Sequence, residues 1–151
     1  MKHAIRPATL EDLETIVDFN LRLAAETEDT ELDRATVRRG VRALLADRAH
    51  GSYYVACKGV IIGQMMHTRE WSDWRNGDIW WIQSVYVHPD HRQQGVCRAL
   101  YAHLREQAAA DPGVVGVRLY VERDNARAQA AYAAFGMRPG GYLVMQDLFG
   151  D

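Results

Sequence analysis

Residues 84–100 read SVYVHPDHRQQGVCRAL, and this stretch decides the fold. Its first residues end a run, 79–87, that is rich in β-branched and aromatic side chains and is typical of a strand. After Gly95, apolar residues recur at helical spacing from Val96 to Ala110. The first N–H groups of a helix have no intrahelical partner, so this strand, turn and helix predict a cradle for a phosphate or pyrophosphate. An ordinary connecting loop is the alternative, because many α/β proteins contain one.

The segments on either side of this stretch also alternate between the apolar spacing of strands and the apolar spacing of helices. Period-2 segments predict strands, and apolar residues spaced three and four apart predict helices. Strands are predicted over 2–6, 53–57, 60–68, 79–87, 114–121 and 142–149, helices over 10–23, 33–45, 96–110 and 126–135, and a loop over 70–77. The chain shows no repeat and no linker, which predicts one three-layer α/β domain over residues 1–151.

Composition narrows the class of protein. The 151 residues are 48% apolar and 25% charged, as in ordinary globular domains. The formal net charge of −2 argues against a nucleic-acid partner, and no apolar run approaches the roughly 18 residues of a membrane span. Without a secretory signal at the start, we expect a cytoplasmic protein with a small-molecule partner. Cys57 and Cys97 show no paired spacing, which fits a reducing compartment.

The sequence also disfavours a Walker-type phosphate loop, a nucleophilic serine and a metal site. Neither Lys2 nor Lys58 follows a glycine-rich phosphate loop, and no serine lies in a G-x-S-x-G context. His88, His91 and Cys97 are ligand types, but structural zinc normally takes four ligands in two close pairs, so no metal is expected. A nucleophilic role for Cys97 is an alternative for which the sequence places no activating base.

The turn within 84–100 also resembles a known motif. Arg92-x-x-Gly95-x-Cys97 is similar to the acetyl-CoA pyrophosphate loop of the GNAT superfamily of N-acetyltransferases, R/Q-x-x-G-x-G/A. Cys97 departs from the pattern, although it is small too. The resemblance implies that main-chain N–H groups of 93–98 bind the pyrophosphate and that the Arg92 and Arg98 side chains add charge-assisted hydrogen bonds. A solvated helix start is the alternative for both arginines.

A second motif lies further along the chain. Asn125-x-x-Ala128-x-x-x-Tyr132-x-x-x-Gly136-Met137 resembles the GNAT segment N-x-x-A-x-x-x-Y-x-x-x-G-F. The resemblance implies a GNAT fold, with a mixed central sheet and helices on both faces, and a Tyr132 that protonates the departing CoA thiolate. A core-packing role is the alternative for Tyr132, and Asn125 would cap its helix under either interpretation. The residues that the resemblance assigns to acetyl-CoA are Val85 and Val87, through main-chain pairing with pantetheine, and Arg92, Gln93, Gln94, Gly95, Val96, Cys97, Arg98 and Asn125.

The resemblance implies direct transfer of the acetyl group of acetyl-CoA onto a primary amine of a small molecule or peptide, by a protein that forms a homodimer. Gln83 stands where many relatives carry a glutamate, and an amide cannot accept the proton of the amine. Glu70, Asp73 and Asp78 are alternative bases. A non-catalytic acyl-CoA sensor on the same fold is the alternative function.

The acceptor is predicted from the loops. The acidic residues of 26–31 and the segment 70–74 are expected to form an acidic, aromatic-lined mouth for a cationic amine similar to a diamine or polyamine. A solvated turn, with tryptophans at a subunit interface, is the alternative. The residues predicted to contact the acceptor are Glu70, Trp71, Asp73 and Gln83.

Overall fold

The computed structural model describes residues 3–150 and divides them into two compact units at Leu119 and Tyr120. We call them the N-terminal unit and the C-terminal unit and describe each by itself. Lys2, which the sequence placed in the first strand, lies outside the described residues. The expectation of a single domain over 1–151 stays a prediction. Within residues 3–150, no helix is both long enough and apolar enough to cross a membrane.

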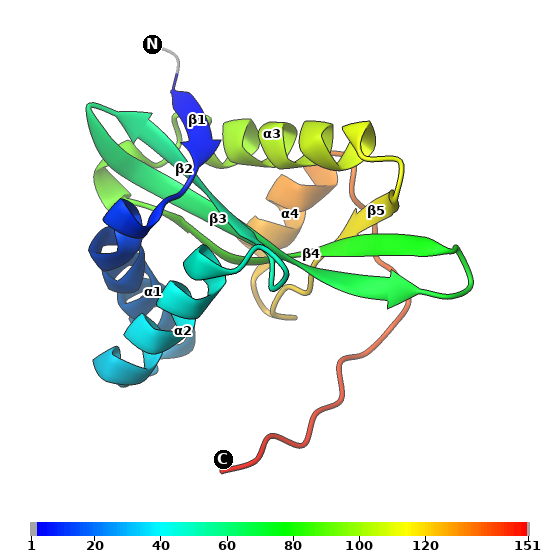
Figure 1. The fold of residues 1–151 in the computed structure, drawn as a ribbon, viewed down its shortest axis with the longest axis horizontal. Coiled ribbons are helices and arrows are strands. Elements are labelled where there is room, and N and C mark those ends of the chain that lie inside the picture. Colours follow the sequence, from blue (N-terminus) through cyan, green and yellow to red (C-terminus); the bar gives the residue numbers. More distant parts are fainter. Residues whose placement is uncertain (1–2, 151) are drawn as a thin grey trace. The chain divides into compact units, whose positions relative to one another are not determined.

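A five-stranded mixed sheet forms the centre of the N-terminal unit (Figure 1). Its strands lie in chain order, and β1 to β4 are antiparallel neighbours while β5 runs parallel to β4. The strands are β1 (Ala4–Pro7), β2 (Ser52–Lys58), β3 (Val60–Ser72), β4 (Gly77–Val87) and β5 (Val114–Arg118). The mixed sheet predicted for this chain is confirmed.

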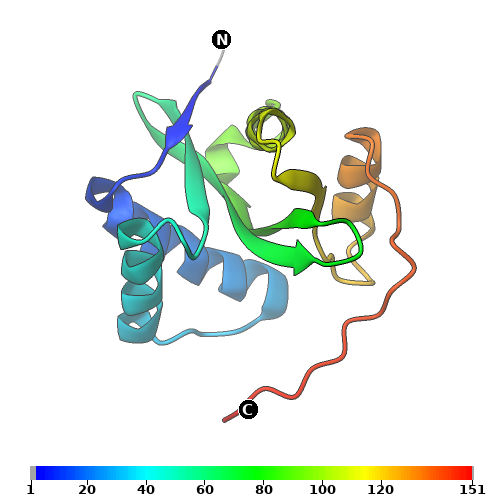
Figure 2. The same cartoon turned by 45° about the vertical axis from the view of Figure 1, so that its right-hand side comes forward.

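Helices cover both faces of this sheet, as predicted. Figure 2 shows α1 (Leu13–Glu28) and α2 (Arg34–Ala46) on one face and α3 (Val96–Ala110) on the other. A short 3-10 turn, Leu10–Asp12, leads into α1. On the first face, α1 and α2 bury an apolar cluster against β2 and β3, which includes Leu13, Ile16, Val17, Val41, Val55 and Met66.

On the other face, the start of α3 lies close to β3. A Cβ atom on Gly63 would lie 2.9 Å from Cγ1 of Val96 and 3.4 Å from Cδ1 of Leu100. Val96 and Leu100 are both buried. The absence of a side chain at Gly63 therefore lets the first turn of α3 seat directly on the sheet.

The β3–β4 hairpin differs from the prediction of a loop over 70–77. Glu70 pairs with Ile79 and Trp71 with Asp78, so only residues 73–76 form the turn. Figure 1 shows this hairpin reaching well beyond the helices that cover the rest of the sheet. The pairing of two long strands supplies the main-chain hydrogen bonds that a loop would have left to water.

Strand β5 is shorter than the predicted 114–121. Its pairing with β4 ends at Arg118 opposite Trp81, and β4 bulges further along, at Ser84, which has a φ of 51°. Beyond Arg118 the chain has no ladder partner in this sheet, so the extended run stops there.

The C-terminal unit contains helix α4 (Ala126–Ala134). The Asn125 side chain caps its start, and Gly136, with a φ of 100°, closes its end, both as predicted. The predicted strand over 142–149 is wrong: this segment has no strand pairing. A strand needs a neighbour, and the described part of this unit holds no other strand to pair with.

Candidate functional site

The outer edge of β4 is open along its second half. Pairing with β5 stops at Trp81, whereas β4 continues to Val87. The bulge at Ser84 shifts the register with β3, from Gln83 opposite Met66 to Tyr86 opposite Gln64. Within the N-terminal unit, residues 82–87 therefore have a strand neighbour on one side only. Such an edge can pair with an extended, amide-bearing ligand, as the prediction for Val85 and Val87 requires.

A buried amide network holds this bulge. Nε2 of the fully buried Gln64 donates to the carbonyl of Ser84 at 3.0 Å and to Oδ1 of Asn20 at 2.8 Å. Nδ2 of Asn20 donates in turn to the hydroxyl of Tyr53 at 2.9 Å. These contacts join α1, β2, β3 and β4. No local sequence pattern indicates these contacts, because the partners are 20 to 44 residues apart.

The turn after β4 forms the predicted helix-start cradle. The first intrahelical bond of this segment runs from the amide of Ala99 to the carbonyl of Gly95, at 3.0 Å. The N–H groups of residues 96–98 therefore have no acceptor within the helix. Gly95 has a φ of 79°, and a Cβ there would meet no atom of the protein within 4 Å. The helix start thus leaves its first N–H groups without intrahelical acceptors and has open space on the Cβ side of Gly95, an arrangement that fits a pyrophosphate.

The loop that carries the cradle is fixed by its own polar contacts. Gln93 has a φ of 62°, and Nε2 of Gln94 donates to the carbonyl of Asp90 at 3.3 Å. The carbonyl of Gln94 lies 3.1 Å from Nε2 of His3. The N–H groups are consequently held in a defined arrangement before any ligand arrives.

The Arg92 side chain, predicted to reach the pyrophosphate, has partners within the protein. Nε donates to the carbonyl of Val87 at 2.9 Å, and one Nη donates to Glu26 of α1 at 2.7 Å. The hydroxyl of Tyr86 donates to the same carboxylate. The hydrogen bond from Tyr86, followed by the contacts with Arg92, lowers the pKa of Glu26. In this structure Arg92 therefore links the cradle to the end of α1.

Cys97 lies in the first turn of α3. Burial raises the pKa of its thiol to about 11. At neutral pH the thiol is therefore protonated, which disfavours the alternative role as a nucleophile.

The four residues predicted to contact the acceptor do not come together. Nε2 of Gln83 donates to the Thr68 hydroxyl at 2.7 Å, within the middle of the hairpin. Asp73 lies in the turn at the far end, and Trp71 pairs with Asp78, which is about 17 Å from Gln83 along β4. Gln83 therefore lies in the middle of the hairpin, whereas Trp71 and Asp73 lie at or near its turn.

Glu70 has a partner of its own. Its carboxylate accepts a hydrogen bond from Arg118 of β5 at 3.1 Å, and the Arg118 guanidinium lies 5.7 Å from the centre of the Trp81 ring. Glu26, in contrast, contacts Tyr86. Tyr86 lies about 30 Å along β4 from Gly77, where the strand begins next to the hairpin turn. The acidic end of α1 and the segment 70–74 therefore do not form a single mouth.

The second motif lies in the C-terminal unit. Oδ1 of Asn125 accepts a hydrogen bond from the amide of Ala128 at 3.0 Å, which is an N-cap. Tyr132 is half-buried, and its ring meets that of Phe135 edge-on at 5.9 Å. The amide of Met137 donates to the carbonyl of Tyr132 at 3.0 Å and ends the helix. The roles of Asn125 and Tyr132 toward acetyl-CoA stay predictions.

The histidines near the cradle have turn geometry. Nδ1 of His88 accepts a hydrogen bond from the amide of Asp90 at 3.1 Å, and the His88 and His91 rings are 6.0 Å apart. Within residues 3–150, no group of three or more His, Cys, Asp or Glu side chains is placed to hold a metal ion.

Known proteins show the same fold. A possible acetyltransferase from Clostridium difficile 630 is 41% identical, with 98% of each chain covered and a TM-score of 0.91. A predicted acetyltransferase with acetyl-CoA from Clostridium acetobutylicum, 16% identical with 99% of each chain covered, gives a TM-score of 0.80. A ribosomal-protein-alanine N-acetyltransferase from Brucella melitensis biovar Abortus 2308 gives 0.77 at 19% identity, with 99% of this chain and 100% of that chain covered. The last two show likeness of fold alone.

Family-level similarity covers most of the chain. None of the curated proteins matches the sequence significantly. The model of the acetyltransferase (GNAT) family matches residues 13–137, which include the cradle, the open edge of β4 and the second motif. The chain therefore belongs to the GNAT acetyltransferase family.

Proposed function

We propose that this protein transfers the acetyl group of acetyl-CoA directly onto a primary amine of a small molecule or peptide. The observation that carries the proposal is the adjacency of two features in residues 82–98. One is an open strand edge, and the other is a helix start whose first N–H groups have no acceptor within the helix. Acetyl-CoA has two groups that match them, an extended pantetheine with amides and a pyrophosphate.

The main chain of this segment does most of the binding in this proposal. The N–H groups of 96–98 hold the pyrophosphate, and the β4 edge near Val85 and Val87 pairs with the pantetheine. Arg92 acts as a positioning residue, because its guanidinium already binds Glu26 and the carbonyl of Val87. The thioester is thereby set in a fixed register along β4.

The transfer step needs one base and one acid. The nitrogen of a neutral amine attacks the thioester carbonyl, the C–S bond breaks, and the amine releases its extra proton to water. The Tyr132 hydroxyl protonates the CoA thiolate and is reprotonated from solvent. A phenol with a pKa near 10 is a suitable acid for a thiolate with a pKa near 8.5.

Gln83 orients the acceptor in this scheme. Its Nε2 donates to the Thr68 hydroxyl at 2.7 Å, so its carbonyl oxygen is the group that can accept an N–H of the amine. An amide cannot remove a proton, which is why the amine must arrive neutral or lose its proton to water. The acceptor class that we propose is a cationic amine, attracted by the exposed carboxylates of Glu28, Asp29 and Glu31.

A second candidate is a non-catalytic acyl-CoA sensor, and Gln83 is the observation that favours it. Measuring thiol release from acetyl-CoA with diamines, amino acids, aminoglycosides and short peptides separates the two candidates. Calorimetric binding of acetyl-CoA is measured alongside. Turnover with one class of amine supports the enzyme. Binding without turnover on any amine supports the sensor, and no binding contradicts both.

A matched pair of glycine variants tests the cradle itself. Gly95 and Gly59 have φ values of 79° and 77°, and a Cβ on either meets no protein atom within 4 Å. Gly95→Ala and Gly59→Ala therefore strain the backbone alike, but only the first puts a methyl group at the cradle. We expect the Kd of acetyl-CoA to rise about tenfold in Gly95→Ala and to stay unchanged in Gly59→Ala. An equal effect would show that the cradle does not bind the pyrophosphate.

A further inference from the structure

The bulge in β4 lies within the open part of that strand. Between two paired positions, β4 has two residues, Ser84 and Val85, where β3 has only Met65. Ser84 has a φ of 51°, a left-handed conformation that glycine normally takes in such a bulge. A serine in this conformation is strained, and a strained residue persists only where its surroundings hold it. Contacts from other elements must therefore fix the conformation of Ser84.

Gln64 supplies a hydrogen bond that fixes the bulge. Its side chain is fully buried, and Nε2 donates to the carbonyl of Ser84 at 3.0 Å and to Oδ1 of Asn20 at 2.8 Å. Both partners are acceptors, so the two N–H groups of one amide serve both. Nδ2 of Asn20 donates to the hydroxyl of the buried Tyr53 at 2.9 Å, which orients the Asn20 amide. A side chain without an amide nitrogen cannot make both hydrogen bonds of Gln64.

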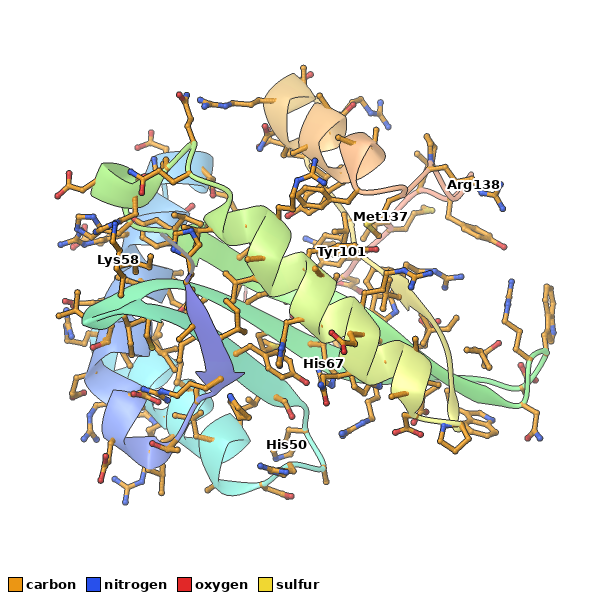
Figure 3. All side chains as sticks on the ribbon, turned by 90° about the horizontal axis from the view of Figure 1, so that it is seen from above. His50, Lys58, His67, Tyr101, Met137 and Arg138 are labelled. Carbon is orange, nitrogen blue, oxygen red and sulfur yellow. The ribbon has the colours of Figure 1, made fainter. Side chains whose placement is uncertain are left out.

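This network lies on the face of the sheet that α1 covers. Asn20 belongs to α1, and Figure 3 shows α1 and α3 on opposite sides of the sheet. The carbonyl of Ser84 is bound to Gln64 within the protein and is not available to a ligand at the open edge. Pairing with a ligand there is left to the neighbouring main-chain groups, such as those of Val85.

The bulge also sets the position of the end of β4. A regular ladder would place Val85 opposite Gln64, whereas the bulge places Tyr86 there. Loss of the bulge would move the rest of β4 by one residue, about 3.4 Å, and would turn Tyr86 to the other face of the sheet. Tyr86 would then lose its hydrogen bond to Glu26, whose carboxylate also binds Arg92 in the loop that carries the cradle. The bulge thus fixes the open edge relative to the cradle.

We propose that Gln64 is a positioning residue for acetyl-CoA and that Asn20 holds it in place. By keeping Ser84 in its left-handed conformation, Gln64 sets the open edge of β4 in register with the cradle. This role rests on the proposed binding of acetyl-CoA along residues 82–98. A ligand that spans both features, with pantetheine on the edge and pyrophosphate in the cradle, depends on that register. A ligand that reaches the cradle alone does not.

The test compares acetyl-CoA with ADP, which carries a pyrophosphate but no pantetheine. Gln64→Met keeps the approximate size of the side chain and removes both hydrogen bonds. We expect it to raise the Kd of acetyl-CoA about tenfold, measured by calorimetry, and to leave the Kd of ADP within about twofold. Gln107→Met makes the same chemical change at an exposed residue of α3 and should alter neither Kd. An equal loss for both ligands in Gln64→Met would contradict the positioning role.

A double variant shows whether Gln64 acts through Ser84. Glycine takes a φ of 51° without strain, so a Ser84→Gly chain depends less on the hydrogen bond from Gln64. Gln64→Met should therefore weaken acetyl-CoA about tenfold in the wild-type chain but only about two- to threefold in the Ser84→Gly chain. A merely structural role would lower the free energy of unfolding without this coupling. The same loss in both chains would overturn the proposal.

Asn20→Ala guards against misfolding of Gln64→Met. Asn20 is half-buried on α1, and alanine favours a helix, so the fold should remain intact. Without its acceptor the Gln64 amide is held less well, so the Kd of acetyl-CoA should rise about threefold and that of ADP should not change. If the wild type does not bind acetyl-CoA, the proposed function is wrong and this role with it. If the wild type binds it and the folded variants bind it as tightly, only the role of Gln64 is wrong.

Discussion

The Tyr132 hydroxyl is the single group on which the proposed chemistry depends most. Its proton would go to the CoA thiolate, an interaction that exists only as the C–S bond breaks. We therefore expect Tyr132→Phe to lower kcat at least tenfold with little change in the Kd of acetyl-CoA. Steady-state kinetics and calorimetry measure the two quantities, and Tyr142→Phe in the same unit is the control. Loss of acetyl-CoA binding in Tyr132→Phe would show a binding role instead.

His67 makes a separate contribution, to stability against acid. Burial holds its folded-state pKa at about 4, whereas the unfolded chain takes up the proton near 6.5. Between these values the unfolded state binds more protons, so stability falls as the pH falls from 6.5 to 4, by about 3 kcal/mol in all. Urea unfolding at pH 7.5, 5.5 and 4.5 measures this loss. His67→Phe should lack it, and parallel pH curves for the two proteins would contradict the assignment.

Two glycines, one at the contact between α3 and β3 and one inside α2, should respond oppositely to substitution by alanine. Gly63→Ala places a Cβ 2.9 Å from Val96 and 3.3 Å from the carbonyl of Tyr86, so α3 must shift. We expect a loss of about 1–3 kcal/mol in the free energy of unfolding. Gly40 lies inside α2 with nothing within 4 Å, and Gly40→Ala should gain about 0.5–1 kcal/mol. Urea denaturation checks both signs, and a neutral Gly63→Ala would mean that the helix can move freely.

Elements with local signals at both ends were predictable from the sequence. Helix α3 begins at Val96 and ends at Ala110 as predicted, because Gly95 precedes it and a breaker follows at 111–113. Elements defined by pairing were not. Glu70 and Trp71 have the composition of a loop and yet pair with β4. The segment 142–149 has the composition of a strand and has no strand partner in the described structure.

The candidate site also has a part that could be predicted from the sequence and a part that could not. The cradle was predictable because its residues are contiguous. The contact of Arg92 with Glu26 joins residues 66 apart, and no periodicity reports such a pair. The stacking of His67 on Trp80 likewise joins two strands, β3 and β4, and follows from their register. The spacing of residues within one element can be read from the sequence. Contacts between elements depend on the register of β3 with β4 and on the bulge at Ser84, which the sequence does not indicate.

The protection of backbone amides against hydrogen exchange should differ between the two units. The residues of the apolar core lie in the N-terminal unit, whereas α4 has nine residues, none of which is buried. We therefore expect amides of β2, β3 and β4 to exchange with solvent hydrogen only on global unfolding, and those of α4 through local opening. Hydrogen exchange followed by mass spectrometry separates these regimes.

Adding acetyl-CoA to the same measurement tests whether both units contribute to one site. If the cradle binds the pyrophosphate and Asn125 and Tyr132 also contact acetyl-CoA, exchange should slow in 93–99 and in 125–136 together, because binding stabilises every segment that it touches. Helix α2 should exchange at an unchanged rate and serves as the internal control. Protection of 93–99 with none in 125–136 would leave the cradle assigned and remove Tyr132 from the reaction, so that another group must protonate the thiolate.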